Sequence, residues 1–427
     1  MRIRLTEAAD QLGIGGTERA LENYCRYIDK SRFEITVVGF REGGVRADIL
    51  RSEGFKVVIA NMNIHVWEEL LKGADVLHWH GDGHLDPAIF ESVRRFKPKV
   101  VIQTNVFGLA DRSSYYDLID VDLYISKMCL VKRVREDGEW GINYNKKRAV
   151  LYYPVDVNGF RYNMPTSKEV EHYRKELGLG NSPVVGRIGR SDDYKFHPVA
   201  IQMMPILRRW VPDVKFLLLG PTENMRRHAI KLGIEDAFVW VEPTTDIGTL
   251  LTYYLCIDVY LAASIGGESF GMNIAEAMAC SLPIVAVSTP KADNAQIELI
   301  DNGLNGLVVE AYPRLVALAC KELFFDKNKR MAMGRAGVER VQSYSAKLIT
   351  RSLENVIYEK LGLESFARDD FQFPIHWTSE MESDYVRRVS NLYGKPSVID
   401  WVKASIRGSG GRLKLKLLRE VTRFVRR

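Results

Sequence analysis

The sequence predicts an α/β protein with two doubly wound domains, each built on a parallel sheet with helices on both faces. Short apolar runs rich in β-branched residues recur between segments with helical spacing, which is the pattern of βαβ units. The runs form two series, separated by YYPVDVNGFR at 152–161, which contains a proline and a glycine but no strong period. Ligands bind at the carboxyl ends of parallel strands, so we expect the domains to face each other across a ligand cleft.

The expected strands are short apolar runs, bounded by turn residues or by helical segments. In chain order they are 33–40, 56–60, 76–79, 100–104, 123–126, 184–189, 215–219, 238–241, 258–262 and 283–287. The spacing of apolar residues predicts a helix at 17–30 and another at 197–210, which Pro212 ends. A third helical run, at 346–361, is expected to close the second sheet, and a fourth is expected at 379–393.

A chain of 427 residues is long enough for two or three domains. We expect a Rossmann-like N-terminal domain at 1–153. A Rossmann-like C-terminal domain at 154–361 would include the closing helix. Residues 362–407 are expected to form a helical or irregular extension, and 408–427 a basic amphipathic tail.

The net charge is concentrated at the C-terminal end. Lys and Arg number 60 and Asp and Glu 54, which gives a formal net charge of +6. Eight basic residues and one acidic residue lie between 404 and 427, which leaves the rest of the chain at −1. A near-neutral body argues against a nucleic-acid partner, because proteins that track nucleic acid present a broad basic surface.

The tail follows a flexible GSGG joint at 408–411 and has an apolar stripe opposite a basic face. The stripe consists of Leu413, Leu417, Val421 and Phe424. Such a helix at 412–427 is expected to lie on an anionic membrane surface, and the alternative is a solvated or partner-bound basic end. No signal peptide or membrane-spanning window is apparent, so we expect a cytoplasmic protein, at most peripheral on the cytoplasmic face of a membrane.

The segment GGESFGMNIAEAMACSLPIV at 266–285 has the strongest functional pattern. Glu268 lies in a glycine-rich loop, and Glu276 lies about one turn inside the helix that the loop opens. Unpaired backbone N–H groups at the start of that helix, from about Phe270 to Asn273, suit an anion such as a diphosphate. Glu276 would point back over the helix start, where a carboxylate can hold both hydroxyls of a ribose. Spacing alone leaves open a surface loop followed by an ordinary helix glutamate.

This segment resembles the E-x7-E signature of the retaining glycosyltransferases of family 4. Further matches follow in the family order, namely LGIGGTERAL (12–21), DVLHWHG (75–81), LYYPVDVNGF (151–160), RSDDYK (190–195) and NGLNGLVV (302–309). The resemblance covers about residues 10–361 and implies the GT-B fold, in which two Rossmann-like domains face each other across a cleft. It also implies that the C-terminal domain binds a nucleotide-sugar donor and the N-terminal domain an acceptor.

The resemblance implies roles for individual residues. Arg190 and Lys195 would grip the donor diphosphate, while Glu268 and His80 would lie at the transferred sugar, and these four form the expected catalytic set. The expected donor-binding residues are Gly15, Gly16, Arg190, Lys195, Phe270, Gly271, Met272, Asn273 and Glu276. Asn105 is expected on the acceptor side.

Two of these assignments have structural alternatives. Arg190 can instead form an ion pair at a helix start with Asp192 or Asp193. His78 and His80 share a face of their strand, and we expect His78 in the core and His80 at the rim of the site, although either can be merely structural. The two histidines have no apparent third ligand, so no metal site is expected.

The chain departs from the family pattern at four places. Ser269 and Ser281 stand where the family has glycine, and Asn105 stands where many members have histidine. The stretch ADNAQIELI at 292–300 lacks the usual Gly-Pro before Glu298. The serines bear on loop conformation, whereas the other two departures bear on the choice of acceptor and sugar.

Together with these observations, the resemblance implies a retaining, metal-independent glycosyltransferase. It would move a hexose-type sugar from a nucleoside-diphosphate sugar to a hydroxyl of a glycan, a lipid-linked acceptor or an envelope glycoconjugate. The resemblance implies that the acceptor attacks from the face of the leaving group and that the departing phosphate takes its proton, so neither an enzyme nucleophile nor a cofactor is required. A GT-B nucleotide-sugar isomerase and a non-catalytic sugar- or nucleotide-binding module are the alternatives.

Overall fold

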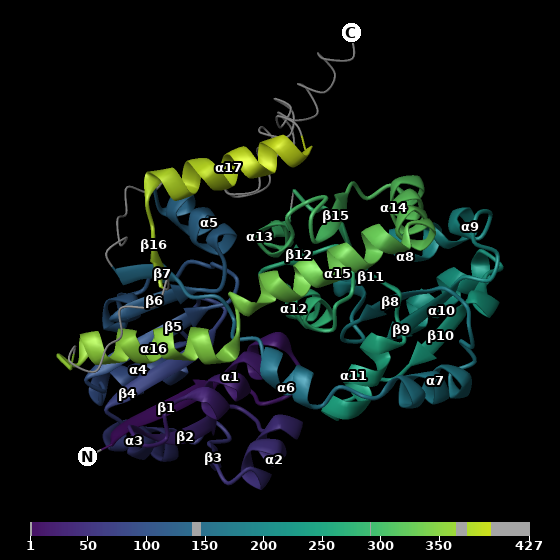
Figure 1. Ribbon diagram of the computed structural model, residues 1–427. Coiled ribbons are helices and arrows are strands. Elements are labelled where there is room, and N and C mark those ends of the chain that lie inside the picture. The colour runs from purple at the N-terminus through teal and green to yellow at the C-terminus, as the bar shows by residue number, and fades with distance from the viewer. Residues whose placement is uncertain (1, 139–146, 291, 364–373, 394–427) are drawn as a thin grey trace. The chain divides into compact units, whose positions relative to one another are not determined.

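The structure, a computed structural model, describes residues 2–138, 147–290, 292–363 and 374–393. The chain divides into two compact units, 1–382 and 383–427. The first unit contains two large sheets with their helices (Figure 1), and the described part of the second unit belongs to helix α17 (Ser379–Tyr393), as the sequence predicts. The basic tail and its expected membrane helix lie outside the described residues. No helix among the described residues is long and apolar enough to cross a membrane.

The first sheet has eight strands within the described residues. In spatial order they are β16 (Ile375–His376), β7 (Arg148–Val150), β6 (Val121–Tyr124), β5 (Val100–Asn105), β4 (Val76–Gly81), β1 (Ile3–Ala9), β2 (Phe33–Gly39) and β3 (Lys56–Ile59). Neighbouring strands run parallel except β16 and β7, which are antiparallel. Strand β1 in the middle of the sheet was not among the expected strands, because Thr6 and Glu7 interrupt its apolar run.

Helices cover both faces of this sheet. Helices α1 (Gly16–Tyr27) and α2 (Val45–Ser52) pack on one face with Ala9, and α3 (Ile64–Gly73) and α4 (Pro87–Arg95) pack on the other with Leu77 and Trp79. The 3-10 helix η1 (Ser114–Leu118) and α5 (Lys127–Gly138) follow. Since successive strand residues point to opposite faces, Glu7 and His78 lie on the face that α1 covers.

The second sheet is parallel throughout. In spatial order its strands are β10 (Phe238–Val241), β9 (Lys215–Leu219), β8 (Val184–Ile188), β11 (Val259–Ala262), β13 (Ile284–Val287) and β15 (Gly306–Val309). A separate parallel pair joins β12 (Gly267–Glu268) to β14 (Asp293–Asn294). The helices around these strands are α6 (Val157–Tyr162), α7 (Ser167–Glu176), α8 (Val199–Gln202), α9 (Met204–Leu207), α10 (Glu223–Lys231), α11 (Ile247–Leu255), α12 (Met272–Ala279), α13 (Gln296–Leu299), α14 (Pro313–Phe325) and α15 (Lys327–Gln342), with the 3-10 turns η3 (Asp193–Lys195) and η4 (Glu235–Ala237).

Two helices differ from the expectation. The helix predicted at 197–210 is divided into α8 and α9, because Pro205 lacks the N–H that would bond to the carbonyl of Ile201. The helix expected to close the second sheet, α16 (Ala346–Lys360), packs instead against α1 (Figure 1). Its Tyr358 ring lies 5.7 Å from the Phe33 ring, and its Glu354 accepts a hydrogen bond from a backbone N–H of the first domain. An apolar stripe indicates that a helix packs, but not on which sheet.

Candidate functional site

The glycine loop, residues Gly266–Gly271, leads into helix α12. Gly267 has a φ of 68° and Gly271 a φ of 100°, which L side chains rarely adopt. A Cβ on Gly267 would lie 1.6 Å from the carbonyl oxygen of Asp293 on the neighbouring strand β14. Glycine is therefore required for the loop to pass this strand and to open the helix.

Glu268 and Lys195 meet beside the glycine loop. Lys195 ends η3, and its Nζ donates to the carbonyl oxygen of Gly267 at 3.0 Å and lies 3.8 Å from Glu268 Oε2. Burial raises the pKa of Glu268, and the neighbouring Lys195 and Arg187 oppose that rise. The Glu268 side chain is 20% exposed and the Lys195 side chain 26% exposed, so a ligand can reach this pair.

Arg187 is a buried cation behind this pair, and it was not among the predicted site residues. It lies in β8, its Nη2 donates to the carbonyl oxygen of Lys195, and its guanidinium lies over the Phe196 ring at 5.4 Å. Burial lowers the pKa of Arg187, while Tyr260 and Glu268 oppose the change. The available signal was an arginine inside the apolar run VVGRIG, because a buried charge needs a partner.

Arg190 is placed differently from Lys195. Its side chain is 51% exposed, and its Nη2 lies 3.9 Å from Asp192 Oδ2, which is the ion pair considered as the structural alternative. Asp192 also caps η3, because its Oδ1 accepts from the backbone N–H of Tyr194 at 2.9 Å. The structure thus brings Lys195 to Glu268 but pairs Arg190 with Asp192.

Glu276 lies in α12 and is 8% exposed. Its Oε2 accepts from the Tyr254 hydroxyl at 2.9 Å, and its Oε1 lies 4.0 Å from Arg19 Nε. Burial raises the pKa of Glu276, and Arg19 and Tyr254 oppose the rise. Tyr254 belongs to α11, whereas Arg19 belongs to α1, so groups from both sheets' domains surround this carboxylate.

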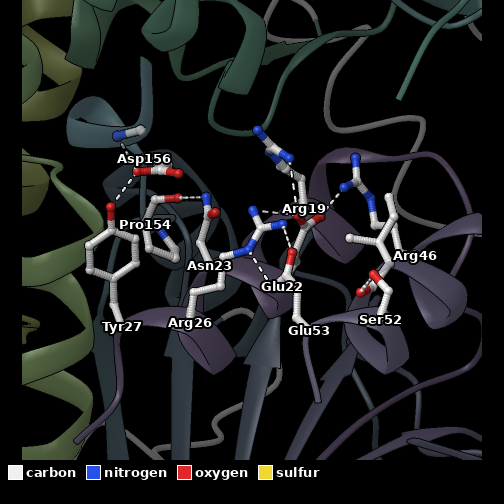
Figure 2. A network of polar contacts seen from close by, with 12 residues as sticks. Arg19, Glu22, Asn23, Arg26, Tyr27, Arg46, Ser52, Glu53, Pro154 and Asp156 are labelled. Atoms are coloured by element: carbon white, nitrogen blue, oxygen red, sulfur yellow. Dashed lines mark hydrogen bonds and ion pairs between the residues drawn. The ribbon is translucent and has the colours of Figure 1, made fainter. Parts of the chain in front are cut away.

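A network of ion pairs holds Arg19 in place (Figure 2). Glu22, one turn further along α1, accepts from Arg19 Nη1 at 3.2 Å and also pairs with Arg26 and with Arg46 of α2. The side chains of Arg19 and Arg46 are each 9% exposed. Burial lowers the pKa of Arg46, and Glu22 opposes that change. This network was not predicted, although Arg19 belongs to the motif LGIGGTERAL.

The starts of α1 and α12 approach each other. A Cβ on Gly16, the first residue of α1, would lie 3.8 Å from the Cβ of Met272, the first residue of α12. Neither N-cap residue, Gly15 or Gly271, makes a side-chain cap hydrogen bond, and the Glu18 carboxylate lies close to Gly15. Helix starts carry free N–H groups and partial positive charge, so two converging starts favour a bound anion.

Two expected donor-binding residues use their side chains to hold the glycine loop. Phe270 is buried, with the rings of Tyr153 and Tyr344 at 5.8 and 5.7 Å. Asn273 Nδ2 donates to the carbonyl oxygen of Ile188 at the end of β8, at 3.0 Å. The Asn273 contact ties the start of α12 to the second sheet, and the Phe270 contacts anchor the loop between two tyrosine rings.

The histidine cluster consists of Glu7, His78 and His80. Pairing of β1 with β4 sets Glu7 opposite His78. His78 Nδ1 lies 3.0 Å from Glu7 Oε1, its Nε2 lies 2.8 Å from Thr104 Oγ1, and His80 Nε2 lies 2.8 Å from Glu7 Oε2. His80 is buried at 2% exposure and not at a rim, because the Tyr24 ring of α1 packs 5.8 Å from its ring.

Glu7 is a third group that the sequence analysis did not find. Each member of the histidine cluster offers one potential ligand atom, and these atoms lie within 4.8 Å of one another. Glu7 is thus a potential third ligand, and the expectation of no metal site rested on the lack of one. Burial alone would raise the pKa of Glu7, but interactions with His78 and His80 lower it to about 2. Burial and the neighbouring His78 lower the pKa of His80 to about 4 against the opposing effect of Glu7. At neutral pH the cluster thus holds an ionised carboxylate beside an uncharged His80.

Asn105 holds a loop at the end of β5. Its Oδ1 accepts from the backbone N–H of Gly108 at 2.8 Å, and its Nδ2 donates to the carbonyl oxygen of Leu109 at 3.1 Å. The side chain is 1% exposed. Asn105 therefore shapes the loop at 105–109 through its side-chain amide.

The departures at Ser269 and in the stretch 292–300 are connected. Ser269 Oγ donates to Asp293 Oδ2 at 2.6 Å, and Lys132 of α5 lies 3.4 Å from Asp293 Oδ1. Glu298 accepts from the backbone N–H groups of Lys127 and Met128 at 3.0 and 2.9 Å, so it caps the start of α5. Burial raises the pKa of Glu298, and these hydrogen bonds oppose the rise. The segment after β14 thus joins the glycine loop to the first domain.

Comparison with known proteins gives a family match within the second domain. Residues 169–340 match the family Glycosyl transferases group 1. A GDP-mannose-dependent alpha-(1-6)-phosphatidylinositol monomannoside mannosyltransferase of Mycolicibacterium smegmatis is 28% identical over 206 residues, which cover 45% of this chain and 52% of that protein. A D-inositol 3-phosphate glycosyltransferase of Segniliparus rotundus is 30% identical over 200 residues, which cover 45% and 42%. The chain spans about half the length of these relatives.

Solved structures match over most of the chain. A glycosyltransferase from Rickettsia africae superposes with a TM-score of 0.69 at 17% identity, over 84% of this chain and 99% of that one. Anabaena HepE in complex with UDP superposes with a TM-score of 0.67 at 17% identity, over 84% and 100%. At these identities the likeness concerns the fold, and the predicted GT-B fold of two Rossmann-like domains is confirmed.

Proposed function

We propose that the chain is a retaining glycosyltransferase that moves a hexose-type sugar from a nucleoside-diphosphate sugar to a hydroxyl acceptor. The observation that carries the proposal is the convergence of the starts of α1 and α12 beside three charged groups. Glu276 lies inside α12, and Lys195 lies next to Glu268 at the glycine loop. The family match over 169–340 and the activities named for the relatives support the same reaction.

In this proposal the two helix starts and Lys195 hold the donor diphosphate, and Arg190 joins them by turning from Asp192. The bond between the anomeric carbon and the diphosphate oxygen breaks, and negative charge grows on the leaving group. Preorganised positive charge stabilises that state more than the ground state and so lowers the barrier. Glu268 holds sugar hydroxyls near the anomeric carbon, and Glu276 holds the ribose.

The acceptor oxygen then bonds to the anomeric carbon from the face that the diphosphate leaves, and its proton passes to a phosphate oxygen of the leaving group. Atoms and charge balance without an enzyme nucleophile, a metal or a cofactor. Glycan and lipid-linked acceptors are the proposed class, since the mycobacterial relative is named for a phosphatidylinositol mannoside. The nucleotide is UDP or GDP, which a solved neighbour and that relative respectively contain in their names.

Donor binding tests the proposal directly. A bound donor raises the unfolding temperature, so a panel of UDP- and GDP-sugars should contain one that stabilises the chain. Glu276→Ala should weaken that donor at least about tenfold, as loss of hydrogen bonds from a buried carboxylate predicts. The control is Glu223→Ala, which alters a glutamate that is 75% exposed on α10. Equal donor affinity in the wild type and both variants would contradict the assignment.

The assay also separates the rival activities. A nucleotide-sugar isomerase would release an altered sugar nucleotide without an acceptor, whereas the proposed transferase releases nucleoside diphosphate in step with a glycosylated acceptor. A binding module would show donor stabilisation and no turnover. Acceptor-dependent release of nucleoside diphosphate is therefore the decisive measurement.

We further propose that the basic tail at 412–427 attaches the enzyme to an anionic membrane surface at the cytoplasmic face. The support is the stripe of apolar residues opposite basic ones in the sequence. Liposomes containing anionic lipid should float the full chain but not a chain that ends at Ser405. Equal flotation of the two chains would refute the attachment.

A further inference from the structure

The side-chain geometry of the histidine cluster determines which ring nitrogens carry protons. Glu7 is 1% exposed and ionised, so its oxygens only accept hydrogen bonds. His80 Nε2 lies 2.8 Å from one of these oxygens and must therefore be the donor. His78 Nδ1 likewise donates to this carboxylate, and its Nε2 lies 2.8 Å from the Thr104 hydroxyl, which can donate or accept. The ionised Glu7 carboxylate therefore fixes a proton on His80 Nε2 and another on His78 Nδ1.

One atom of the cluster is left without a partner. His80 Nδ1 is buried and accepts no hydrogen bond from any described residue. His80 is also the next-to-last residue of β4, at the carboxyl end of a parallel strand, where ligands of α/β sheets bind. A buried nitrogen with a free lone pair costs free energy unless a ligand hydroxyl or a water donates to it.

We infer that Glu7 is a positioning residue that holds His80 with its proton on Nε2, so that Nδ1 accepts a hydrogen bond from a hydroxyl of the bound sugar. Glu7 itself does not contact the sugar in this proposal. It acts through its hydrogen bond to the His80 ring. The assignment of the hydroxyl to a sugar rests on the proposed function, whereas the proton position does not.

This arrangement makes the site selective for a hydroxyl that donates. A fluorine at the same carbon has nearly the same size but offers no proton, so it leaves Nδ1 as unsatisfied as a hydrogen does. A site built around a fixed acceptor therefore rejects both analogues, whereas a site in which His80 donated would tolerate fluorine better than hydrogen.

The proton position is measured on the wild-type chain by long-range correlation of ring nitrogens and carbons in NMR spectra at pH 7. The His80 signals are identified by their loss in His80→Gln. We expect a protonated Nε2 and an unprotonated Nδ1, and the opposite assignment or a doubly protonated ring would overturn the inference. This result does not depend on transfer activity, so it is distinguishable from a failure of the proposed function.

Two variants separate positioning from folding. Glu7→Met keeps a similar volume but removes both acceptor oxygens, and we expect His80 to lose its single proton position. Thr104→Val removes the other partner of His78 and leaves Glu7 in contact with His80, so His80 should keep its tautomer. Unchanged His80 signals in a folded Glu7→Met, or a switched tautomer in Thr104→Val, would overturn the role of Glu7. If Glu7→Met does not fold, the wild-type spectrum still decides.

Donor affinity provides the readout of specificity. Donors with each sugar hydroxyl replaced in turn by hydrogen or by fluorine should reveal one position at which both replacements weaken donor binding by about tenfold to a hundredfold. Glu7→Met should reduce that loss at the same position, because its His80 ring can present either nitrogen form. Full tolerance of fluorine at every position would contradict a fixed acceptor.

Discussion

The glycine loop and the histidine cluster are the two groups of candidate site residues, and the chain assembles them in different ways. The loop and its glutamates lie within one short segment, and their geometry follows from glycines with positive φ and from a helix start. The histidine cluster joins residues 71 positions apart through the pairing of β1 with β4. Local chemistry thus determines the first region, and strand pairing between distant segments determines the second.

The largest effect is expected at Lys195, which lies beside the glycine loop. Lys195→Ala removes the cation that lies beside Glu268 and donates to Gly267, and it should lower kcat by about a hundredfold to a thousandfold, as loss of one preorganised charge-stabilising group does. Steady-state transfer kinetics with saturating donor provide the measurement.

The matched control is Lys231→Ala, which removes an exposed lysine at the end of α10 and should leave kcat within twofold. A loss in kcat below about tenfold for Lys195→Ala would show that the helix starts alone hold the leaving group. In that case Lys195 would contribute less to stabilising the leaving group than the starts of α1 and α12 do.

The candidate site was only partly predictable, because one region lies within a single segment of the sequence and the other joins distant segments. Glu268, Glu276 and the glycines were singled out because they lie in one contiguous segment that resembles a known signature. Glu7 was missed because it lies in an unpredicted strand, and the register of β1 against β4 cannot be read from either strand alone. Arg19 was missed because its partner Glu276 lies in the other domain.

The fold shows the same division between local and distant information. The alternation of strands and helices predicted two Rossmann-like domains, and those are present. The packing of α16 against α1 was not predicted, because an apolar helix face shows that the helix is buried but does not identify the element it packs against. The interruption at Pro205 was available in the sequence, and the apolar spacing on both sides concealed it.

The histidine cluster predicts a dependence of stability on pH. The pKa of His80 is about 4 in the folded chain and 6.5 as its ordinary value, so the folded state resists protonation. The free energy of unfolding should be highest above pH 6.5 and should fall by at most about 3 kcal/mol as the pH drops through 4. Chemical unfolding at a series of pH values gives the slope.

His80→Gln serves as the reference, because it removes the titrating ring and should flatten the curve between pH 6.5 and 4. Glu7 contributes in a separate range, since its pKa is lowered from 4.5 to about 2 and its stabilisation is lost only below pH 4.5. An identical slope in the wild type and His80→Gln would mean that other groups cause the dependence.

Glu298 connects the glycine-loop region to the first domain, because it follows β14 and caps the start of α5. Glu298→Ala should lower the free energy of unfolding by about 2 kcal/mol, since two backbone N–H groups and the Tyr152 hydroxyl lose a charged acceptor. Glu310→Ala, at an exposed glutamate, is the control. A loss below about 0.5 kcal/mol, the range of ordinary surface changes, would show that the domains do not depend on this cap.

The smallest effect concerns Ser281, where the chain departs from glycine just after α12. Ser281 keeps a left-handed conformation with a φ of 60°, which costs an L residue about 1–2 kcal/mol, and glycine adopts it without that strain. Ser281→Gly should therefore raise the free energy of unfolding by about 0.5 kcal/mol, because the added freedom of glycine in the unfolded chain offsets part of the gain. Ser343→Gly is the matched control, since Ser343 has an ordinary φ of −63° at the end of α15 and should lose stability instead. If both substitutions destabilise the chain equally, the turn after α12 is not strained by serine. The backbone preferences that made the glycine loop predictable would then not apply to the turn at Ser281.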